Sequence, residues 1–354
     1  MSAMSSRTIL VLSILFSLSI GCSEPYSPAL TKIIYVEESD FDSISLPAPE
    51  SINLDLPGVI SLKLCDSVLL ATSSSEKILH IYDRNNKNES GSYISKGNGP
   101  FELLYSPFCS SFCIGQDNHD TVIRFADFLT KRFYKINLTQ TLIQKKLIIE
   151  QIGKGRDDQQ VLTTLVIDDT SYFGKRLSEK ADTQERFYVK DGQEFISEDM
   201  ARLNSFRLNA PDGGFNFNLL SAILGLSRER GLIVEAMTLL NQIQVYSLSG
   251  QSRGFTIANG KLRDIHHLER NPQVSTNGYC ALSIHEDYFT ALYQKDESRN
   301  QLQFFSWDGN PLWIIDLDPG VRSYDIDSQA GTLITLNNDD ETVNSYEIPE
   351  LRTR

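Results

Sequence analysis

The stretch "RNQLQFFSWDG", residues 299–309, alternates polar and apolar residues and ends in an aromatic residue and a turn. Five further segments follow the same pattern: "SEKILHIYDRN" (75–85), "FLTKRFYKINL" (128–138), "DTQERFYVKDG" (182–192), "LNQIQVYSLSG" (240–250) and "DETVNSYEIPE" (340–350). Their aromatic positions, Tyr82, Tyr134, Tyr188, Tyr246, Phe305 and Tyr346, are 52, 54, 58, 59 and 41 residues apart. Alternation bounded by turn residues is typical of β-strands, and its recurrence indicates a fold of repeated units.

Six copies predict an all-β chain folded as a six-bladed β-propeller with four antiparallel strands per blade. The repeated segment is expected to be the third strand of each blade, and second strands are visible as "SVLLATS", "DTVIRFAD", "GLIVEAM", "YFTALYQ" and "TLITLNN". Asp308-Gly309 and Ser249-Gly250 are typical hairpin turns. The alternative of a β-sandwich with a small second domain does not account for six repeats.

The last copy is followed by only a few residues, so the sixth blade lacks an outer strand. The β-like segments "TKIIYVEE" and "ESINLDL" precede the first blade without a partner. We therefore expect a strand from within residues 31–56 to pair with the strand that carries Tyr346. Such pairing closes the ring and removes an exposed sheet edge.

Residues 1–21 have the pattern of a secretory signal peptide, with Arg7 followed by an apolar run from Ile9 to Ile20. Gly21-Cys22 resembles a bacterial lipobox, although Ser19 stands where leucine is usual. The resemblance implies cleavage before Cys22, lipidation of that cysteine and a cell-envelope, outer-membrane location. The alternative is an ordinary signal peptide with a chance cysteine. The predicted organisation is thus a signal peptide (1–21), a lipid-anchored tether (22–31) and a propeller (32–354).

The chain from Cys22 onward is strongly acidic. Its 32 Lys and Arg residues, all but Arg7, stand against 46 Asp and Glu residues and give a formal net charge of −14. Such a surface repels nucleic acid, so a nucleic-acid-binding role is not expected. We expect a monomer that meets the membrane through its lipid anchor.

Four cysteines remain beyond Cys22: Cys65, Cys109, Cys113 and Cys280. In an exported chain they could pair in three ways. If "FCSSFC" were one strand, Cys109 and Cys113 would be about 13 Å apart, beyond disulfide reach. Their spacing also differs from that of zinc sites. We expect them to serve as small buried apolar residues.

The segment "KGNGPFELLYSP", residues 96–107, could be a phosphate-binding loop or a connection between blades. It has no Lys-Ser or Lys-Thr pair and no third glycine, so the phosphate-binding motifs are absent. We place it between the outer strand of blade 1 and the inner strand of blade 2, where Gly97 and Gly99 would allow a sharp turn and Pro100 would fix its exit.

This segment also resembles the G-x-G-P-x-E loop of six-bladed, TolB-like β-propeller lipoproteins of Bacteroidota. The matching residues are Gly97, Gly99, Pro100 and Glu102. The resemblance implies a protein anchored in the outer membrane with a binding or scaffold role.

No catalytic motif is apparent, and we expect no cofactor and no metal ion. None of the five histidines forms an H-E-x-x-H or H-x-H motif, and "QDNHD" (116–120), "DLDPG" and "DIDSQAG" (within 316–331) are interpreted as turns. No G-x-S-x-G elbow is present. A propeller enzyme, such as a metal-dependent lactonase or a lyase acting at the central channel, remains the alternative function.

Two connections are unusually long, residues 197–214 and 259–278, and both carry cations. Long ordered loops are often functional. We expect an anionic ligand, an acidic glycan or acidic peptide, to bind the residues Arg202, Arg207, Arg263, His266 and His267 at the channel mouth. In the alternative reading, these loops cover each other and pair with Asp264 and Glu269. The predicted function is therefore a binding or scaffold propeller for an anionic glycan or a protein partner; a subunit of a membrane complex is a further alternative.

Overall fold

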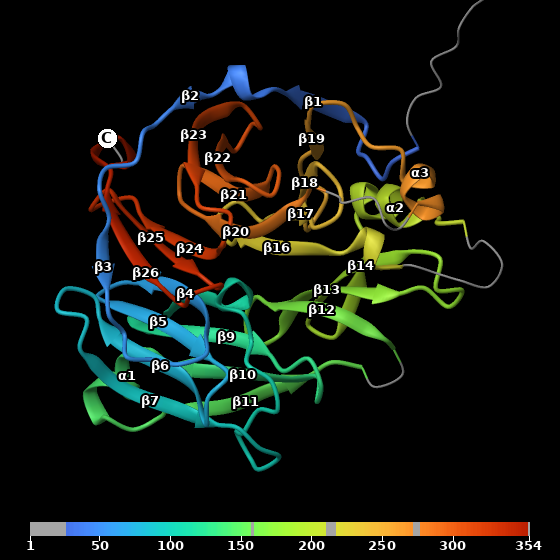
Figure 1. Cartoon of the computed structure of the whole chain (residues 1–354). Helices are drawn as coiled ribbons and strands as arrows, with labels where there is room; N and C mark the ends of the chain where they lie inside the picture. The colour runs from blue at the N-terminus through green and yellow to red at the C-terminus, as the bar shows by residue number, and fades with distance from the viewer. Residues whose placement is uncertain (1–25, 157–158, 210–216, 272–276, 353–354) are drawn as a thin grey trace, which may run out of the picture.

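The computed structural model describes residues 26–156, 159–209, 217–271 and 277–352. Six sheets, each built around four strands, form a ring (Figure 1). The first strands of blades 1 to 5 line one central cavity through Lys63, Ile114, Leu165, Leu224 and Leu282, which places these strands innermost. The prediction of a six-bladed propeller with four antiparallel strands per blade is confirmed.

The first three blades are continuous in sequence. From the inner to the outer strand, blade 1 contains β4 (Val59–Cys65), β5 (Val68–Ser73), β6 (Lys77–Asp83) and β7 (Glu89–Ser95). Blade 2 contains β8 (Cys113–Asp117), β9 (Asp120–Ala126), β10 (Arg132–Asn137) and β11 (Ile149–Lys154). Blade 3 contains β12 (Val161–Val166), β13 (Ser171–Leu177), β14 (Gln184–Lys190) and β15 (Gln193–Phe195).

The other three blades each add a strand from the N-terminal segment. Blade 4 contains β16 (Ala222–Ser227), β17 (Leu232–Met237), β18 (Gln242–Ser247), β19 (Phe255–Asn259) and β1 (Lys32–Val36). Blade 5 contains β20 (Tyr279–Ile284), β21 (Tyr288–Gln294), β22 (Asn300–Ser306), β23 (Pro311–Leu317) and β2 (Asp42–Ser43). Blade 6 contains β24 (Val321–Asp327), β25 (Thr332–Asn337), β26 (Val343–Glu347) and β3 (Glu50–Ile52).

The six repeated aromatic residues all lie in third strands, as predicted: β6, β10, β14, β18, β22 and β26. A third strand is paired on both sides within its blade, and its two faces pack toward neighbouring blades. Clusters of buried apolar side chains accordingly join blades 1 and 2, blades 4 and 5, blades 5 and 6, and blades 6 and 1. Of the repeated aromatic residues, Tyr82, Tyr134, Tyr246 and Phe305 are buried, whereas Tyr188 and Tyr346 are half-buried.

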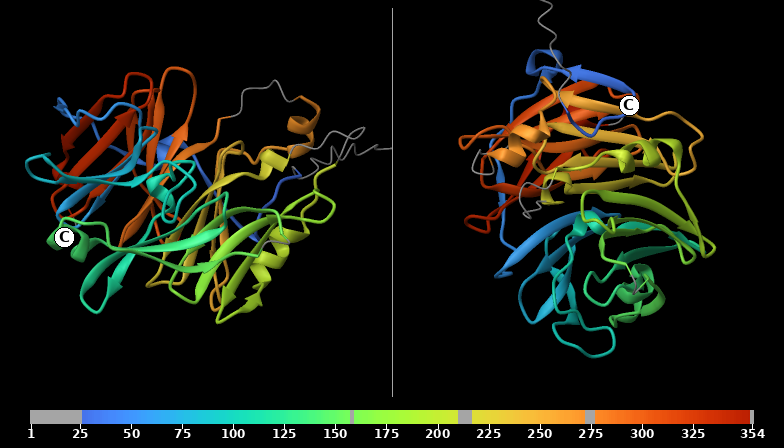
Figure 2. Two further views of the ribbon diagram at one scale, coloured as in Figure 1. Left: turned by 90° about the horizontal axis from the view of Figure 1, so that it is seen from below. Right: turned by 90° about the vertical axis from the view of Figure 1, so that its right-hand side faces the viewer.

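The N-terminal segment closes the ring. β3 pairs antiparallel with β26, with Ile52 opposite Val343, so the predicted pairing with the strand carrying Tyr346 is confirmed. Two further pairings were not predicted: β1 runs parallel to β19, and β2 runs parallel to β23. The segment, drawn in blue, therefore follows the outside of blades 4 to 6 like a belt (Figures 1 and 2).

Helices are short and occur in the connections. They are α1 (Leu138–Gln144), α2 (Glu198–Ser205), α3 (Ile265–Arg270) and the single-turn 3-10 helices η1 (Glu38–Asp40), η2 (Cys109–Ser111), η3 (Phe217–Leu220) and η4 (Pro349–Leu351). Asn137, Ser197 and Asp264 cap the N-termini of α1, α2 and α3 with their side-chain oxygens. Within the described residues, no helix is both long enough and apolar enough to cross a membrane.

Candidate functional site

The glycine-rich segment lies between β7 and β8, as predicted. Its two glycines, however, do not provide the expected sharp turn. Neither Gly97 nor Gly99 has a left-handed backbone conformation; Phe101 does, with φ of 61°. The Gly99 N–H donates to the Glu102 Oε2 over 2.7 Å. A β-carbon on Gly97 would lie 2.2 Å from the same oxygen. The glycines therefore leave room for the Glu102 carboxylate, which holds the loop together.

The chain after this loop enters the channel. We call residues 105–112 the plug. Its helix η2 contacts the inner strands β4, β16 and β20, which belong to blades on different sides of the ring. Cys109 is fully buried, and its N–H donates to the Ser61 Oγ over 2.8 Å. The plug therefore occupies part of the channel and is fastened to blade 1.

The cysteine segment is not one strand, because Cys109 lies in η2 and Cys113 begins β8. Cys65, Cys109, Cys113 and Cys280 are free thiols, the first three buried and the last half-buried. Burial raises the pKa of Cys65 to about 12 and the pKa of each of the other three to about 11. Cys65, Cys109 and Cys113 are thus buried as expected of small apolar residues, and the high pKa of all four thiols disfavours the reactive thiolate.

An apolar pocket of about 530 Å³ lies beside the plug. Its walls are the plug, the turn between β9 and β10, and the inner strands β12 and β16; the residues are Leu103, Tyr105–Phe108, Ser110, Ser111, Ala126–Leu129, Lys131, Phe133, Gly155, Val161–Leu165, Tyr172 and Ala222–Leu224. Connections from outer to inner strands and turns from second to third strands lie on the same face of an antiparallel propeller. The plug and the β9–β10 turn therefore meet on one face, over blades 2 to 4.

The rim of this pocket is aromatic and open to solvent. Tyr105 is 71% exposed, Phe108 60% and Phe128 64%, and Leu129 is exposed beside them. Phe101 and Leu104, which precede the plug, are exposed as well. Clustered exposed apolar side chains around a concave site mark binding surfaces in soluble proteins. We call Tyr105, Phe108, Phe128 and Leu129 the aromatic rim.

Polar groups of the pocket mainly hold its own walls in place. Asp127 accepts from the Leu129 N–H over 3.0 Å and from Thr130 Oγ1, which fixes the β9–β10 turn. Lys131 Nζ donates to the Gln159 carbonyl over 2.7 Å. The Ser111 Oγ donates to the Phe108 carbonyl over 2.7 Å, so the plug carries its rim residue on a fixed turn. The walls are preformed, and the space they enclose suits an apolar group.

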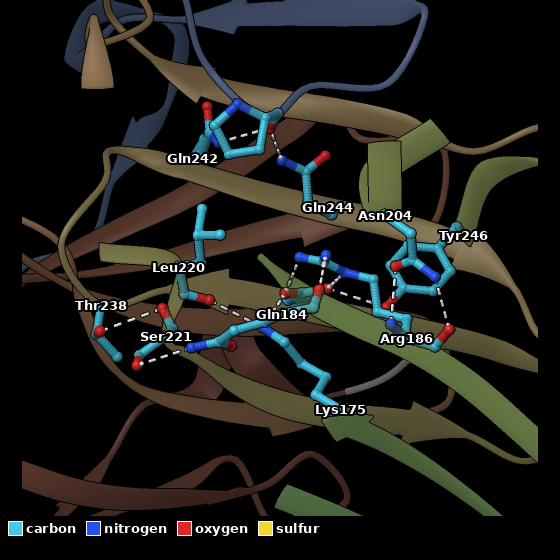
Figure 3. Close-up of polar contacts among 12 residues, drawn as sticks. Lys175, Gln184, Arg186, Asn204, Leu220, Ser221, Thr238, Gln242, Gln244 and Tyr246 are labelled. Atoms are coloured by element: carbon cyan, nitrogen blue, oxygen red, sulfur yellow. Dashed lines mark hydrogen bonds and ion pairs between the residues drawn. The ribbon is translucent and has the colours of Figure 1, made fainter. Parts of the chain in front are cut away.

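Figure 3 shows a buried ionic cluster that joins blade 3 to blade 4, the blades whose inner strands are β12 and β16. Glu235 of blade 4 accepts from Lys175 Nζ at 2.5 Å, from Arg186 Nε and Nη2 at 2.9 and 2.7 Å, and from Tyr246 Oη at 2.9 Å. Lys175 and Arg186 come from blade 3, and Lys175 also donates to the Leu220 carbonyl at 2.9 Å. The cluster therefore joins blade 3 to blade 4.

The cluster has two cations and one anion, all buried. Burial alone would raise the pKa of the Glu235 carboxyl, but Arg186 and Lys175 outweigh it and hold that pKa at about 2. Burial lowers the pKa of Lys175 to about 8 in spite of Glu235. Burial also raises the pKa of Tyr246, which stays a neutral donor. This arrangement suits a structural role in joining the blades, since the three charged side chains are almost completely shielded from solvent.

The five cationic residues predicted as an anion site lie on or beside α2 and α3, at the outer rim of the ring (Figure 1), and none of them lines the pocket. Arg202 Nε donates to the Ala29 carbonyl over 3.1 Å, and Arg207 pairs with Asp182 at 3.4 Å. His266 pairs with Glu269 at 2.8 Å, while Asp264 caps α3. Arg263 is half-buried and His267 is exposed.

The structure brings Arg207 and His266 together through the N-terminal segment. The Tyr26 ring stacks on the His266 ring at 4.2 Å between centroids, and its hydroxyl donates to the Arg207 carbonyl over 2.9 Å. Several of these side chains thus hold other parts of the chain, including the expected acidic partner Glu269. Binding of an acidic glycan at this place stays a prediction.

The segment "QDNHD" contains a tight turn, as interpreted, whereas "DLDPG" and "DIDSQAG" are turns only in part, because Asp316 lies in β23 and Asp325 and Asp327 lie in β24. Asp117 and Asp120 face each other at the ends of β8 and β9, with Asn118 and His119 in left-handed conformations between them. Among the described residues, no group of three or more His, Cys, Asp and Glu side chains could hold a metal ion. The aromatic rim was missed at the sequence level, although large apolar residues in the turn "DFLT" and in the connection "FELLYSPF" were the available signal.

No protein-family model matches the sequence, and none of the curated proteins is similar to it. Among solved structures, a member of the DUF4221 family from Bacteroides vulgatus aligns over 85% of this chain and 96% of its own, with a TM-score of 0.54 and 10% identity. A Bacteroides fragilis protein named as exported aligns over 86% of this chain and 98% of its own, with a TM-score of 0.50 and 10% identity. At such identities the likeness is one of fold: this chain shares its propeller architecture with proteins of Bacteroides.

Proposed function

We propose that this protein is a binding propeller of the cell envelope, anchored by a lipid on Cys22, whose apolar pocket receives apolar side chains of a protein partner. The observation that carries the proposal is the preformed pocket of about 530 Å³ beside the plug, surrounded by the aromatic rim. The volume lies in the range of natural ligand sites, about 300–1,000 Å³.

The proposed address combines several observations. The first 21 residues have the pattern of a signal peptide, and Gly21 precedes Cys22 as in a lipobox. One of the proteins with the same fold, from Bacteroides fragilis, is named as exported. Together with the G-x-G-P-x-E loop, these features support membership in the TolB-like propeller lipoproteins of Bacteroidota.

A protein partner fits the pocket better than a glycan does. Sugars need several convergent hydrogen-bonding groups, whereas Asp127, Lys131 and Ser111 are engaged in holding the walls. Exposed Tyr and Phe side chains around a pocket are typical of the centres of protein interfaces. The acidic surface of the chain, with a formal net charge of −13 for the whole sequence, adds selectivity for partners that are not acidic.

The experiment is a fluorescence titration with Nile red, an uncharged apolar dye that stands in for an apolar side chain. Wild type should bind the dye in a saturable manner. Thr163→Trp places an indole in the pocket from β12 and should abolish binding. Phe108→Ala and Phe128→Ala should each weaken it about tenfold, because burying the exposed part of a Phe side chain contributes about 1–2 kcal/mol.

Phe195→Ala is the matched control, since this Phe is also exposed but lies on β15, away from the pocket. Its affinity for the dye should equal that of wild type. Both rim positions are exposed, so their truncation leaves the fold intact and keeps the test valid even if Thr163→Trp folds poorly. Binding that is unaffected by all three pocket variants would rule out the pocket as the site.

A further inference from the structure

We propose that the edge of the ring formed by α2, α3 and residues 26–30 lies against the lipid head groups of the membrane that carries the anchor. This inference rests on the proposed lipidation of Cys22. It concerns a surface of blades 3 and 4 that is separate from the apolar pocket. Its partner is the head-group layer of a bilayer.

The first described residues are docked on this edge, so residues 26–30, which were predicted to belong to the tether, are part of the folded ring. The Tyr26 ring lies between Phe206, at 4.5 Å, and His266, at 4.2 Å. The Ile265 N–H donates to the Tyr26 carbonyl over 2.8 Å. Tyr26 thus connects the end of the α2 connection with the start of α3.

The chain that follows Tyr26 is hydrogen-bonded to the ring at Pro28 and Leu30. The Pro28 carbonyl accepts from both Gln242 Nε2 and Gln244 Nε2, each at 2.7 Å, and both glutamines are buried (Figure 3). The Leu30 N–H donates to Thr256 Oγ1 over 2.8 Å, and the Leu30 side chain is buried in the core. A segment with buried polar partners and a buried apolar side chain does not detach easily. Tyr26 is therefore a fixed point on the ring.

The distance from this fixed point to the anchor is limited by covalent geometry. Four residue steps join Cys22 to Tyr26, and they span at most about 14 Å in any conformation. A single seven-residue strand of a blade is already about 23 Å long. With its lipid in the bilayer, Cys22 lies at the membrane surface, so the edge around Tyr26 must lie close to that surface, whereas the tether holds no other part of the ring there.

The exposed charged residues of this edge are mostly cations, whereas the chain as a whole is acidic. Its exposed charged residues are four cations, Arg202, Arg207, Lys261 and Arg270, and two anions, Glu198 and Asp264. Arg263, Asp199 and Glu269 are half-exposed, and Arg207 is paired with Asp182. The chain as a whole is acidic, with a formal net charge of −13. A locally basic edge is attracted to anionic head groups, while the acidic remainder is repelled. Tyr26, which is exposed on the same edge, is a residue type favoured at membrane interfaces.

The test uses the lipidated full-length protein, reconstituted into vesicles with brominated lipids, which quench nearby fluorophores. A fluorophore is attached through Ala201→Cys, an exposed position on α2, or through Asp339→Cys, an exposed position in the β25–β26 turn of blade 6, across the ring. We expect loss of emission at position 201 and unchanged emission at position 339. Inserting twenty Gly and Ser residues between Glu24 and Pro25 should remove the difference.

The outcomes separate this inference from the proposed function. Equal quenching at both positions, or quenching only at position 339, in protein that is lipidated and vesicle-bound overturns the orientation and leaves the anchor intact. Mass spectrometry that finds no lipid on Cys22 refutes the anchor itself and this inference with it. Neither result bears on Nile red binding at the pocket.

Discussion

Replacing Glu235 by Gln should destabilise the ring at the joint between blades 3 and 4. The substitution keeps the shape but removes the only anion of a buried cluster that contains Lys175 and Arg186. Breaking a buried ion pair by removing one partner costs about 3–5 kcal/mol, because a buried charge loses its compensation. For the roughly 310 described residues, with an unfolding entropy of about 2.1 cal/mol/K per residue, this lowers Tm by about 5–8 °C.

The assay is thermal unfolding followed by circular dichroism, with chemical denaturation as a second measure of the free energy. Glu229→Gln is the matched control, because Glu229 is exposed in the β16–β17 turn of the same blade. It should change stability by no more than about 0.5 kcal/mol. If Glu235→Gln were as stable as Glu229→Gln, the cluster would not fasten the blades, and the reasoning would be refuted.

The cluster holds one more cation than anions, so removing Lys175 should have a much smaller effect on stability than removing Glu235. Lys175→Met leaves Arg186 and Glu235 as a balanced pair, so it should cost far less than Glu235→Gln. Burial lowers the pKa of Lys175 to about 8, against 10.5 for an ordinary lysine. At this residue the unfolded state therefore binds more protons between these values, so Lys175 makes a contribution to wild-type stability that rises as pH increases from about 8 to 10.5; the cysteines with raised pKa values lower the stability of wild type and variant alike over that range. In Lys175→Met this rise should be missing; an identical pH profile would contradict the assignment.

Three further predictions concern the N-terminal segment that carries β1, β2 and β3, the glycine-rich loop at residues 96–107 and the lipid anchor. Deleting Thr31–Leu56 should abolish the cooperative unfolding transition, because it removes β3 and two extra outer strands; a transition at the wild-type temperature would contradict the closure. Gly97→Ala should cost about 0.5–1.5 kcal/mol in urea unfolding, because the new β-carbon displaces the half-exposed Glu102 carboxylate from its hydrogen bond, whereas Gly155→Ala meets only ordinary contacts and should be near neutral; equal stability of the two would argue against the role of the carboxylate. Cys22→Ala should move the protein from the membrane to the soluble periplasmic fraction on centrifugation; retention in the membrane would disprove the lipid anchor.

The architecture could be predicted from sequence because its signal is local. Each third strand, such as β22 with Phe305, carries alternation, an aromatic residue and a turn within eleven residues. The closure by β3 followed from counting strands in the last blade. The parallel pairing of β1 with β19 and of β2 with β23 could not be predicted, because a β-like segment such as "TKIIYVEE" does not specify which outer strand it joins.

The candidate site was harder to predict because it depends on contacts between distant segments. The cations of the two long connections were recognised, but not that Tyr26, 181 residues before Arg207, occupies the space between them. The segment at residues 96–107 was placed correctly, yet the descent of the plug into the channel depends on the fit of Cys109 against Ser61. The aromatic rim becomes visible only when the plug and the β9–β10 turn are side by side.

The central claim, that the pocket receives apolar side chains of a protein partner, is tested most directly by selecting binders from a random peptide library on the wild-type protein. The affinities of enriched peptides are then measured on wild type, on Thr163→Trp and on the double variant Phe108→Ala/Phe128→Ala. We predict enriched peptides that share large apolar residues, bind wild type, lose binding to Thr163→Trp, and bind the rim variant at least about tenfold more weakly. Peptides that lack apolar residues, or that bind all three proteins equally well, would contradict the claim.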